Sequence, residues 1–352
     1  MYAFVGDLHL GVKLPNEDYM KSLNMFFGLI KKYKEPCHGI FIVGDLFDHR
    51  LTIEENKFAA LFIANLVCNG VGRDGSNVPV YFIHGTYSHD LDQYETFIPL
   101  IQKIPNTKVF YYKNACETVI DGHDVLIIPH ESGDVDYTQF KKHYDIIAGH
   151  GVISSQIYNP CKTTNGICLS AESLGNTSYV CVFGHYHGYT NFGNNVYYTG
   201  PWLRWKYGED EQRVFFFCND DYTITTKKNP FAMEFKTIEI ENPEQLRDAI
   251  NCNITTPHRF IIKSDPSDMD TYRGIILATK QNSNIRYQLS EIVEEDEYEN
   301  NDVDNDEQSD DGSSVSRPIP ALVEYIKEKY NVDATEQLTE YENVINKDMK
   351  EN

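Results

Sequence analysis

Short apolar runs alternate with segments of helical periodicity along the first third of the chain. The runs at 2–5, 39–43 and 78–83 are continuously apolar, whereas 19–33 and 54–69 repeat apolar side chains every three or four residues. Strands that are buried on both faces lose the alternation of apolar and polar positions, and helices commonly connect such strands in parallel sheets. The pattern therefore predicts successive β-α-β units and an α/β fold.

Beyond residue 107 the pattern changes to short strands with few helices between them. Strands are predicted at 109–112, 118–120, 125–128, 145–148, 180–183, 196–199, 214–218 and 222–226. Asn-Pro, Asn-Gly and Gly-Asn pairs within 151–178 indicate that most of this stretch is loop. Residues 1–230 are thus expected to form one domain, in which two sheets pack together with helices outside.

The last third of the chain divides into three predicted segments. Strands at 235–240 and 259–263, each followed by a helix, predict a small capping unit over 231–290. Residues 291–316 contain twelve acidic residues and no Lys or Arg, a composition that predicts a disordered linker. Apolar positions 319, 322, 323, 326 and 330 share one helical face, so 317–352 is predicted to be a C-terminal helical segment.

Charge and cysteine content bear on where the protein is located and on which partners it can bind. The formal charge is -22, but the acidic linker leaves only -10 on the rest of the chain, and bound divalent cations would offset part of that locally. Eight cysteines form no CxxC pair, which favours reduced thiols, although Cys161 and Cys168 flank a short loop and could close a disulfide. No apolar run approaches the roughly 20 residues of a membrane span and no signal peptide is visible, so we expect a cytoplasmic protein without membrane contact.

Five clusters of Asp and His follow the apolar runs in order along the chain. They are Asp7-Leu8-His9, Gly44-Asp45-Leu46-Phe47-Asp48, Ser88-His89-Asp90, Gly149-His150 and Gly184-His185-Tyr186-His187. Taken singly, an Asp-x-His or His-x-His sequence is more typical of a surface loop. Because the carboxyl ends of parallel strands meet at one edge of a sheet, the recurrence after four strands indicates a shared site.

The residue types in these clusters suit two divalent metal ions. Asp7 and His9 are two residues apart, so both would point to the same side of an extended backbone, and His185 and His187 repeat that spacing. His150 adds another imidazole, and Asp45, at the end of the next strand, is the natural bridge between two ions. Carboxylate and imidazole donors bind first-row divalent cations, and paired ions catalyse phosphoester hydrolysis.

The five motifs resemble those of the calcineurin-like metallophosphoesterases over about residues 1–230. The resemblance implies a four-layer α-β-β-α sandwich with two divalent ions, most simply Mn²⁺, while Fe²⁺, Zn²⁺ and Mg²⁺ also fit. One ion would be bound by Asp7, His9, Asp45 and His187, and the other by Asp45, Ser88, His150 and His185. The resemblance also implies that His89 is the catalytic histidine and that Asp48 orients it or supports the site.

One motif departs from the family pattern. The third motif is usually Gly-Asn-His-Asp or Gly-Asn-His-Glu with Asn as a metal ligand, whereas here the chain reads Gly85-Thr86-Tyr87-Ser88-His89-Asp90. Ser88 therefore stands where Asn is expected, and the glycine is displaced by two residues. Since a serine hydroxyl is shorter and a weaker neutral donor than an amide, the second ion is expected to be held more loosely or through a water.

Three further features resemble the SbcD (Mre-eleven) DNA double-strand-break repair nucleases, above all the phage recombination nuclease subunits. The stretch Tyr198-Thr199-Gly200-Pro201, followed by Gly208-Glu209, is similar to their Gly-Ser-Pro and later Glu stretch. Residues 231–290 stand where those nucleases carry a DNA-capping domain. Residues 317–345 stand where they carry helices that dock on the coiled coil of an ABC/SMC-like ATPase. The alternatives are a second domain with no role in DNA binding and a tail helix that packs on its own core.

The sequence thus favours a metal-dependent DNA exonuclease/endonuclease subunit of an SbcCD-like recombination and repair complex, dimeric by resemblance and located in the host cytoplasm if phage-encoded. Attack on phosphorus would be in line, with His89 assisting departure of the 3′ oxygen. Aromatic residues near the expected rim could stack on bases, or could simply pack their loops: Tyr87, Tyr158, Tyr186, Trp202, Trp205 and Tyr207. Two other hypotheses are a small-molecule phosphodiesterase or phosphatase of the same superfamily, and a catalytically weak scaffold for the ATPase.

Overall fold

The computed structural model describes residues 1–130, 142–154, 168–209, 212–251, 256–265, 268–278 and 285–291. The chain separates into two compact units, the first formed by 1–203 and 211–232 and the second by 204–210 and the described residues from 233 onward. Residues 204–210 thus belong with the second unit, although the sequence pattern assigned them to the first domain. The expected linker after Glu291 and the expected helical segment 317–352 lie outside the described residues.

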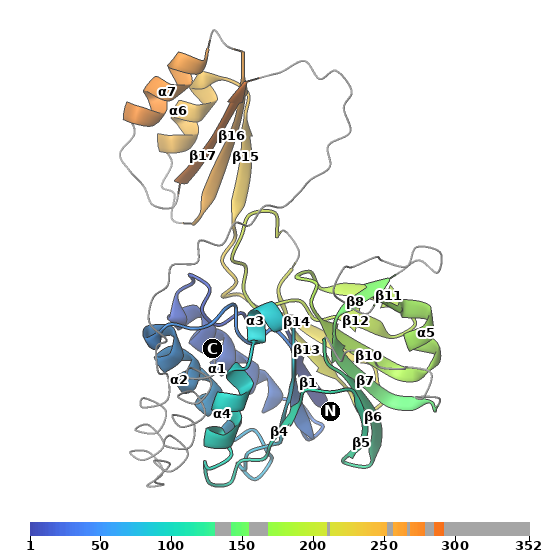
Figure 1. The fold of residues 1–352 in the computed structure, drawn as a ribbon. Coiled ribbons are helices and arrows are strands. Elements are labelled where there is room, and N and C mark those ends of the chain that lie inside the picture. Colours follow the sequence, from blue (N-terminus) through green and yellow to red (C-terminus); the bar gives the residue numbers. More distant parts are fainter. Residues whose placement is uncertain are drawn as a thin grey trace, which may run out of the picture. The chain divides into compact units, whose positions relative to one another are not determined.

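Two six-stranded sheets form the first unit (Figure 1). The first sheet has the order β14-β13-β1-β2-β3-β4, with the bounds Ile224–Lys228, Val214–Cys218, Tyr2–Val5, Gly39–Val43, Val80–Ile83 and Val109–Tyr112. The second has the order β11-β12-β10-β7-β6-β5, with the bounds Thr190–Gly193, Val196–Tyr198, Ser178–Gly184, Tyr144–His150, His123–Ile128 and Cys116–Ile120. Strands β1 to β4 run parallel, as do β6, β7, β10 and β12. The expected α/β class with parallel-rich sheets is confirmed.

Five helices and a small two-stranded sheet complete the first unit. The helices are α1 (Asn16–Ile30), α2 (Ile53–Val67), α3 (Tyr87–Asp90), α4 (Gln93–Ile101) and α5 (Ala171–Asn176), and the strands are β8 (Val152–Ser154) and β9 (Cys168–Ser170). Helices α1 and α2 connect the parallel strands as predicted, and a capping box between Thr52 and Glu55 fixes the start of α2. Helix α4 was not predicted, and α5, β8 and β9 lie in a stretch that the sequence pattern described as mostly loop.

Each of the two six-stranded sheets buries both faces along its central strands. Along β1 and β2, Ala3 and Ile40 point to the helix side, where α1, α2 and α4 pack, while Phe4 and Phe41 point to the other side. Phe4 and Phe41 share a core with Val182 of the second sheet, so the two sheets pack face to face. Helix α5 covers the far face of the second sheet. This double burial explains why the strand sequences are continuously apolar.

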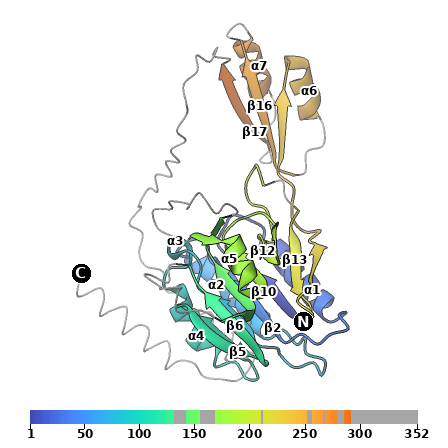
Figure 2. The same cartoon turned by 90° about the vertical axis from the view of Figure 1, so that its right-hand side faces the viewer.

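The second unit is a three-stranded parallel sheet with two helices on one face (Figure 2). Its elements are β15 (Lys236–Ile240), α6 (Pro243–Asn251), β16 (His258–Ser264), α7 (Met269–Ala278) and β17 (Ile285–Glu291). The first four match the predicted elements, and β17 was not predicted. Leu246 of α6 and Tyr272 of α7 pack on Phe260 and Ile262 of the central strand. Among the described residues no helix covers the opposite face of this sheet.

The described helices and cysteines bear on two further expectations. None of the helices in the described ranges has the length and apolar composition needed to cross a membrane. Cys37, Cys68, Cys116, Cys181 and Cys218 are free thiols. The alternative pairing of Cys161 with Cys168 involves a residue outside the described part of the chain.

Candidate metal centre

The ends of five parallel strands bring the Asp and His clusters together. The loops after β1, β2 and β3 of the first sheet meet the ends of β7 and β10 of the second. Two close approaches mark the meeting point: the ring nitrogen Nδ1 of His150 lies 2.9 Å from the carbonyl oxygen of Val43, and a Cβ on Gly184 would lie 2.2 Å from that same oxygen. A larger residue at 184 would therefore push the two sheets apart.

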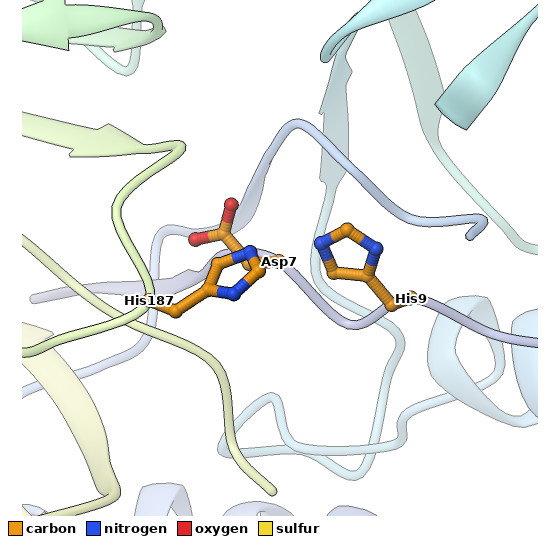
Figure 3. A group of neighbouring side chains, drawn as sticks. All are labelled: Asp7, His9 and His187. Carbon is orange, nitrogen blue, oxygen red and sulfur yellow. The ribbon is translucent and has the colours of Figure 1, made fainter. Parts of the chain in front are cut away.

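Asp7, His9 and His187 form the first group of donor atoms (Figure 3). Their three ligand atoms lie within 4.8 Å of one another. One carboxylate oxygen of Asp7 accepts a 2.7 Å hydrogen bond from the backbone N–H of His185. The other, Oδ2, is buried and accepts no hydrogen bond from any described residue. A buried carboxylate oxygen without a donor is costly unless a cation binds it, which fits a metal ligand.

Asp45, His150 and His185 form the second group, again with ligand atoms within 4.8 Å of one another. The Nδ1–H of His150 donates to the carbonyl of Val43, so its Nε2 atom faces Asp45 Oδ2 at 3.2 Å. A histidine that donates one ring nitrogen to a carbonyl is held in the tautomer whose other nitrogen can bind a metal.

Asp45 lies between the two groups. Its Oδ2 atom is 3.7 Å from Nε2 of His9 and 3.2 Å from Nε2 of His150, while its Oδ1 atom accepts a 2.6 Å hydrogen bond from the backbone N–H of Thr86. One carboxylate oxygen thus faces histidines of both groups. This is the placement that a bridging ligand requires.

Asp48 and His89 lie beside the first group. Together with His9 they form a third set of neighbouring donor atoms, and the rings of His9 and His89 are 4.7 Å apart. The Asp48 side chain accepts a 3.0 Å hydrogen bond from Nδ1 of His9, whereas its backbone carbonyl accepts a 2.6 Å hydrogen bond from Nδ1 of His89. Asp48 therefore orients His89 through the main chain and His9 through the carboxylate.

Burial and close charges shift the pKa values of the site. Burial raises the pKa of Asp7. Burial alone would raise the pKa of Asp45, but His150 and His9 hold it well below its usual range. Burial disfavours the charged form of His150, yet the carboxylate of Asp45 outweighs it and raises the pKa of His150 to about 9. Burial, with His150 nearby, lowers the pKa of His185 to about 4, so this imidazole is neutral and available to a metal.

The backbone at the candidate ligands adopts a rare conformation. Asp7, His9, Asp45 and His185 have φ angles of 51°, 46°, 45° and 111°. A positive φ is uncommon and unfavourable in residues other than glycine, and such residues cluster at functional sites. The strand ends therefore turn sharply at the ligands themselves.

The structure does not bring Ser88 to either group. Ser88 is exposed on the single turn of α3, and within the described part of the chain its hydroxyl makes no hydrogen bond with Asp45, His150 or His185. Thr86, two residues earlier, lies there instead, with its Oγ1 atom 3.3 Å from both Asp45 Oδ2 and His150 Nε2. The expectation for Ser88 assumed that the donor directly precedes His89, whereas the hydroxyl next to Asp45 and His150 stands three residues before His89, at the start of α3.

Two further residues of the site were given no role from the sequence. His130 follows β6, and its ring stacks on His185 with centroids 5.3 Å apart. The sequence did contain a signal for His130, because an apolar run ends just before this histidine, as it does before the other clusters. Asp90 is fully buried and accepts hydrogen bonds from the backbone N–H groups of Phe47 and Gly85 at 3.1 and 2.7 Å. It joins the loops after β2 and β3, and burial raises its pKa to about 6.

The aromatic residues expected at the rim fall into two kinds. Tyr87 and Tyr186, which stand next to Thr86 and between the two histidines of the last cluster, are each 52% exposed. Trp202 is buried and packs on Phe26 and Phe215, so it belongs to the core. Trp205 and Tyr207 belong to the second unit, and Tyr158 lies outside the described residues.

Comparison with known proteins assigns neither a family nor a function to the chain. Neither a protein-family model nor a curated protein matches the chain. Among solved structures, a protein of unknown function from Aquifex aeolicus, AQ665, is similar over 49% of this chain and 89% of its own at 12% identity and a TM-score of 0.25. A likeness at that level supports no conclusion about fold or activity.

Proposed function

We propose that this protein is a two-metal phosphodiesterase that hydrolyses DNA. The observation that carries the proposal is the position of Asp45 Oδ2, 3.7 Å from Nε2 of His9 and 3.2 Å from Nε2 of His150. Two donor groups, with the carboxylate of the second also facing a histidine of the first, match the requirements of a dinuclear site. The mixed oxygen and nitrogen donors suit first-row divalent ions, of which we propose Mn²⁺.

The side chains divide into ion-binding and proton-transfer roles. Asp7, His9, His187 and Asp45 would hold one ion, and Asp45, His150 and His185 would hold the other. Such ions activate a water and neutralise charge on the phosphoryl oxygens. His89 donates its Nδ1–H to the carbonyl of Asp48, so its Nε2 atom is the position from which a proton can pass to the leaving oxygen.

The sheet of the second unit supports DNA as the substrate. We use "open face" for the side of β15–β17 opposite α6 and α7, which carries the residues that alternate with the packed ones. On it Arg259 and Arg286 are register partners on adjacent strands, and the Arg259 guanidinium lies 5.0 Å from the ring centre of Tyr207. Parallel sheets are usually covered on both faces. Paired arginines beside an aromatic ring suit a phosphate backbone with stackable bases.

We further propose a four-layer architecture for the first unit and an ATPase partner for the chain. Helices on the outer faces of two packed sheets support a four-layer α-β-β-α sandwich with a small capping unit. By resemblance, we propose a cytoplasmic homodimer in an SbcCD-like complex, in which residues 317–345 bind the coiled coil of an ABC/SMC-like ATPase. Pull-down of such an ATPase with the full chain and with a chain ending at 316 tests that part.

A comparison of substrates tests the activity. The protein loaded with Mn²⁺ should cleave linear duplex DNA and bis-p-nitrophenyl phosphate, and should leave a cyclic nucleotide largely intact. His89→Ala should lower the rate about 10²- to 10⁴-fold, the usual contribution of a positioned acid, while Mn²⁺ binding stays unchanged. His143→Ala is the matched control, because His143 is exposed and outside the site. A His89→Ala protein that cuts DNA at the wild-type rate would refute the role of His89, and cleavage of the cyclic nucleotide but not of DNA would favour a small-molecule phosphodiesterase.

A further inference from the structure

The loop after β3 brings one hydroxyl group to the second donor group, that of Thr86. Its Oγ1 atom lies 3.3 Å from Asp45 Oδ2 and 3.3 Å from His150 Nε2, and those two atoms are 3.2 Å apart. The three atoms therefore form a nearly equilateral triangle. Tyr87 and Ser88, the other hydroxyl-bearing residues next to Thr86, are exposed.

The size of the triangle fits three ligands of a single ion. Ligands bound at about 2.1 Å stand roughly 3.0 Å apart when their bonds meet at a right angle, and roughly 3.4 Å apart at the tetrahedral angle. The observed edges of 3.2 and 3.3 Å fall between these limits. His185, whose ligand atom belongs to the same group, would supply a further nitrogen.

The local backbone holds Thr86 in this position. The backbone N–H of Thr86 donates to Asp45 Oδ1 at 2.6 Å, and that of Gly85 donates to Asp90 at 2.7 Å. Gly85 itself is packed so closely that a Cβ would lie 2.0 Å from the backbone nitrogen of Asp45. The Thr86 side chain thus has a fixed starting point next to Asp45.

The Thr86 side chain does not cap the helix that it precedes. It is the N-cap residue of α3, yet its side chain makes no capping hydrogen bond. Threonine at an N-cap commonly accepts a hydrogen bond from a backbone N–H of the first turn. Here the hydroxyl is directed to Asp45 and His150 instead.

We propose that the Thr86 hydroxyl completes the second ion site and makes it the weaker of the two, an inference that rests on the two-metal function proposed above. A neutral hydroxyl is a poorer donor than a carboxylate or an imidazole. The first group has Asp7, His9 and His187, whereas the second combines Thr86 with two histidines and the shared Asp45. Loading of the second site therefore depends on this one side chain.

Titration of the metal-free full chain with Mn²⁺, followed by calorimetry and by the electron paramagnetic resonance of free Mn²⁺, tests the inference. The wild type should bind two ions in separate steps. Thr86→Val, which keeps the shape and removes the hydroxyl, should weaken the second step about 10- to 100-fold and leave the first unchanged. Thr86→Ser should retain both steps, and Ser88→Ala should match the wild type.

The outcomes separate this inference from the proposed function. If Thr86→Val binds the second ion as tightly as the wild type, or if Ser88→Ala loses it, the inference is overturned while a two-metal enzyme stands. If the wild type binds two ions and Thr86→Val loses the second, but neither hydrolyses a phosphodiester, the inference stands and the function is refuted. A wild type that binds a single ion overturns both. The unchanged first step in Thr86→Val shows that the variant is folded.

Discussion

Replacing Gly85 by alanine tests the tight packing of the strand ends around Asp45. A Cβ at this position would lie 2.0 Å from the backbone nitrogen of Asp45 and 2.3 Å from its Oδ1 atom. Ordinary contacts begin at 3.4 Å, so the loops after β2 and β3 must separate by about 1.4 Å. Both neighbouring atoms are fixed, since Asp45 Oδ1 already accepts the hydrogen bond from Thr86.

The expected cost follows from overpacking. Forcing extra carbon atoms into a packed site destabilises a protein by about 1 to 3 kcal/mol, and each kcal/mol lowers the melting temperature of a domain of this size by about 2 to 4 °C. Because Asp45 faces both donor groups, Gly85→Ala should also weaken the binding of both Mn²⁺ ions, by about 10- to 100-fold.

Gly28→Ala is the matched control for this variant. Gly28 lies within α1, and a Cβ there would meet nothing within 4 Å. Alanine is favoured over glycine inside a helix by about 0.5 to 1 kcal/mol, so this variant should be slightly more stable and should bind Mn²⁺ normally. Differential scanning calorimetry of the metal-free proteins and Mn²⁺ titration measure both effects. A Gly85→Ala protein that melts with the wild type and binds two ions as tightly would refute the packing argument.

Two other perturbations address the open face and the charge of the site. Arg286→Gln should lower DNA affinity about three- to tenfold and make the slope of log affinity against log salt less negative by about 0.9, the value for one lost phosphate contact. Arg273→Gln on α7 is the control with the same charge change; equal losses in both would rule out a specific role of the open face. In the metal-free protein, burial lowers the pKa of His150, but the Asp45 carboxylate outweighs burial and raises this pKa to about 9. The ion pair of charged His150 with Asp45 therefore stabilises the fold fully below pH ~6.5, and this stabilisation is lost as the pH rises through 9. Unfolding midpoints in chelator from pH 6 to 10 should fall in the wild type and stay flatter in Asp45→Asn; parallel curves would contradict the pairing.

Much of the first unit could be predicted because its strands are buried on both faces. The continuous apolar runs at β1, β2 and β3 identified a parallel sheet, and the Asp and His clusters at their ends marked the edge at which the site lies. Helix α4 was not predicted, and its sequence includes Pro99, a residue that argues against a helix interior. Strand β17 alternates apolar and polar residues along a sheet with one open face, and this weaker signal was missed.

The donor set was harder to predict than the fold around it. The position of Thr86 depends on a single helical turn between it and His89, and spacing along the chain does not reveal that turn. His130 lacks a neighbouring Asp or a second His, although it follows an apolar run as the other clusters do. The assignment of 204–210 to the second unit depends on contacts between residues distant in sequence, such as that of Tyr207 with Phe235, the residue before β15.

The central claim is that Asp45 joins two metal ions in one site. The most direct test is the electron paramagnetic resonance spectrum of the chain loaded with Mn²⁺. Two ions that share a carboxylate stand about 3.5 to 4 Å apart and are magnetically coupled. We predict two bound ions per chain with a coupled spectrum, and loss of the coupling in Asp45→Asn. One bound ion, or two ions with the spectrum of isolated Mn²⁺, would contradict the account.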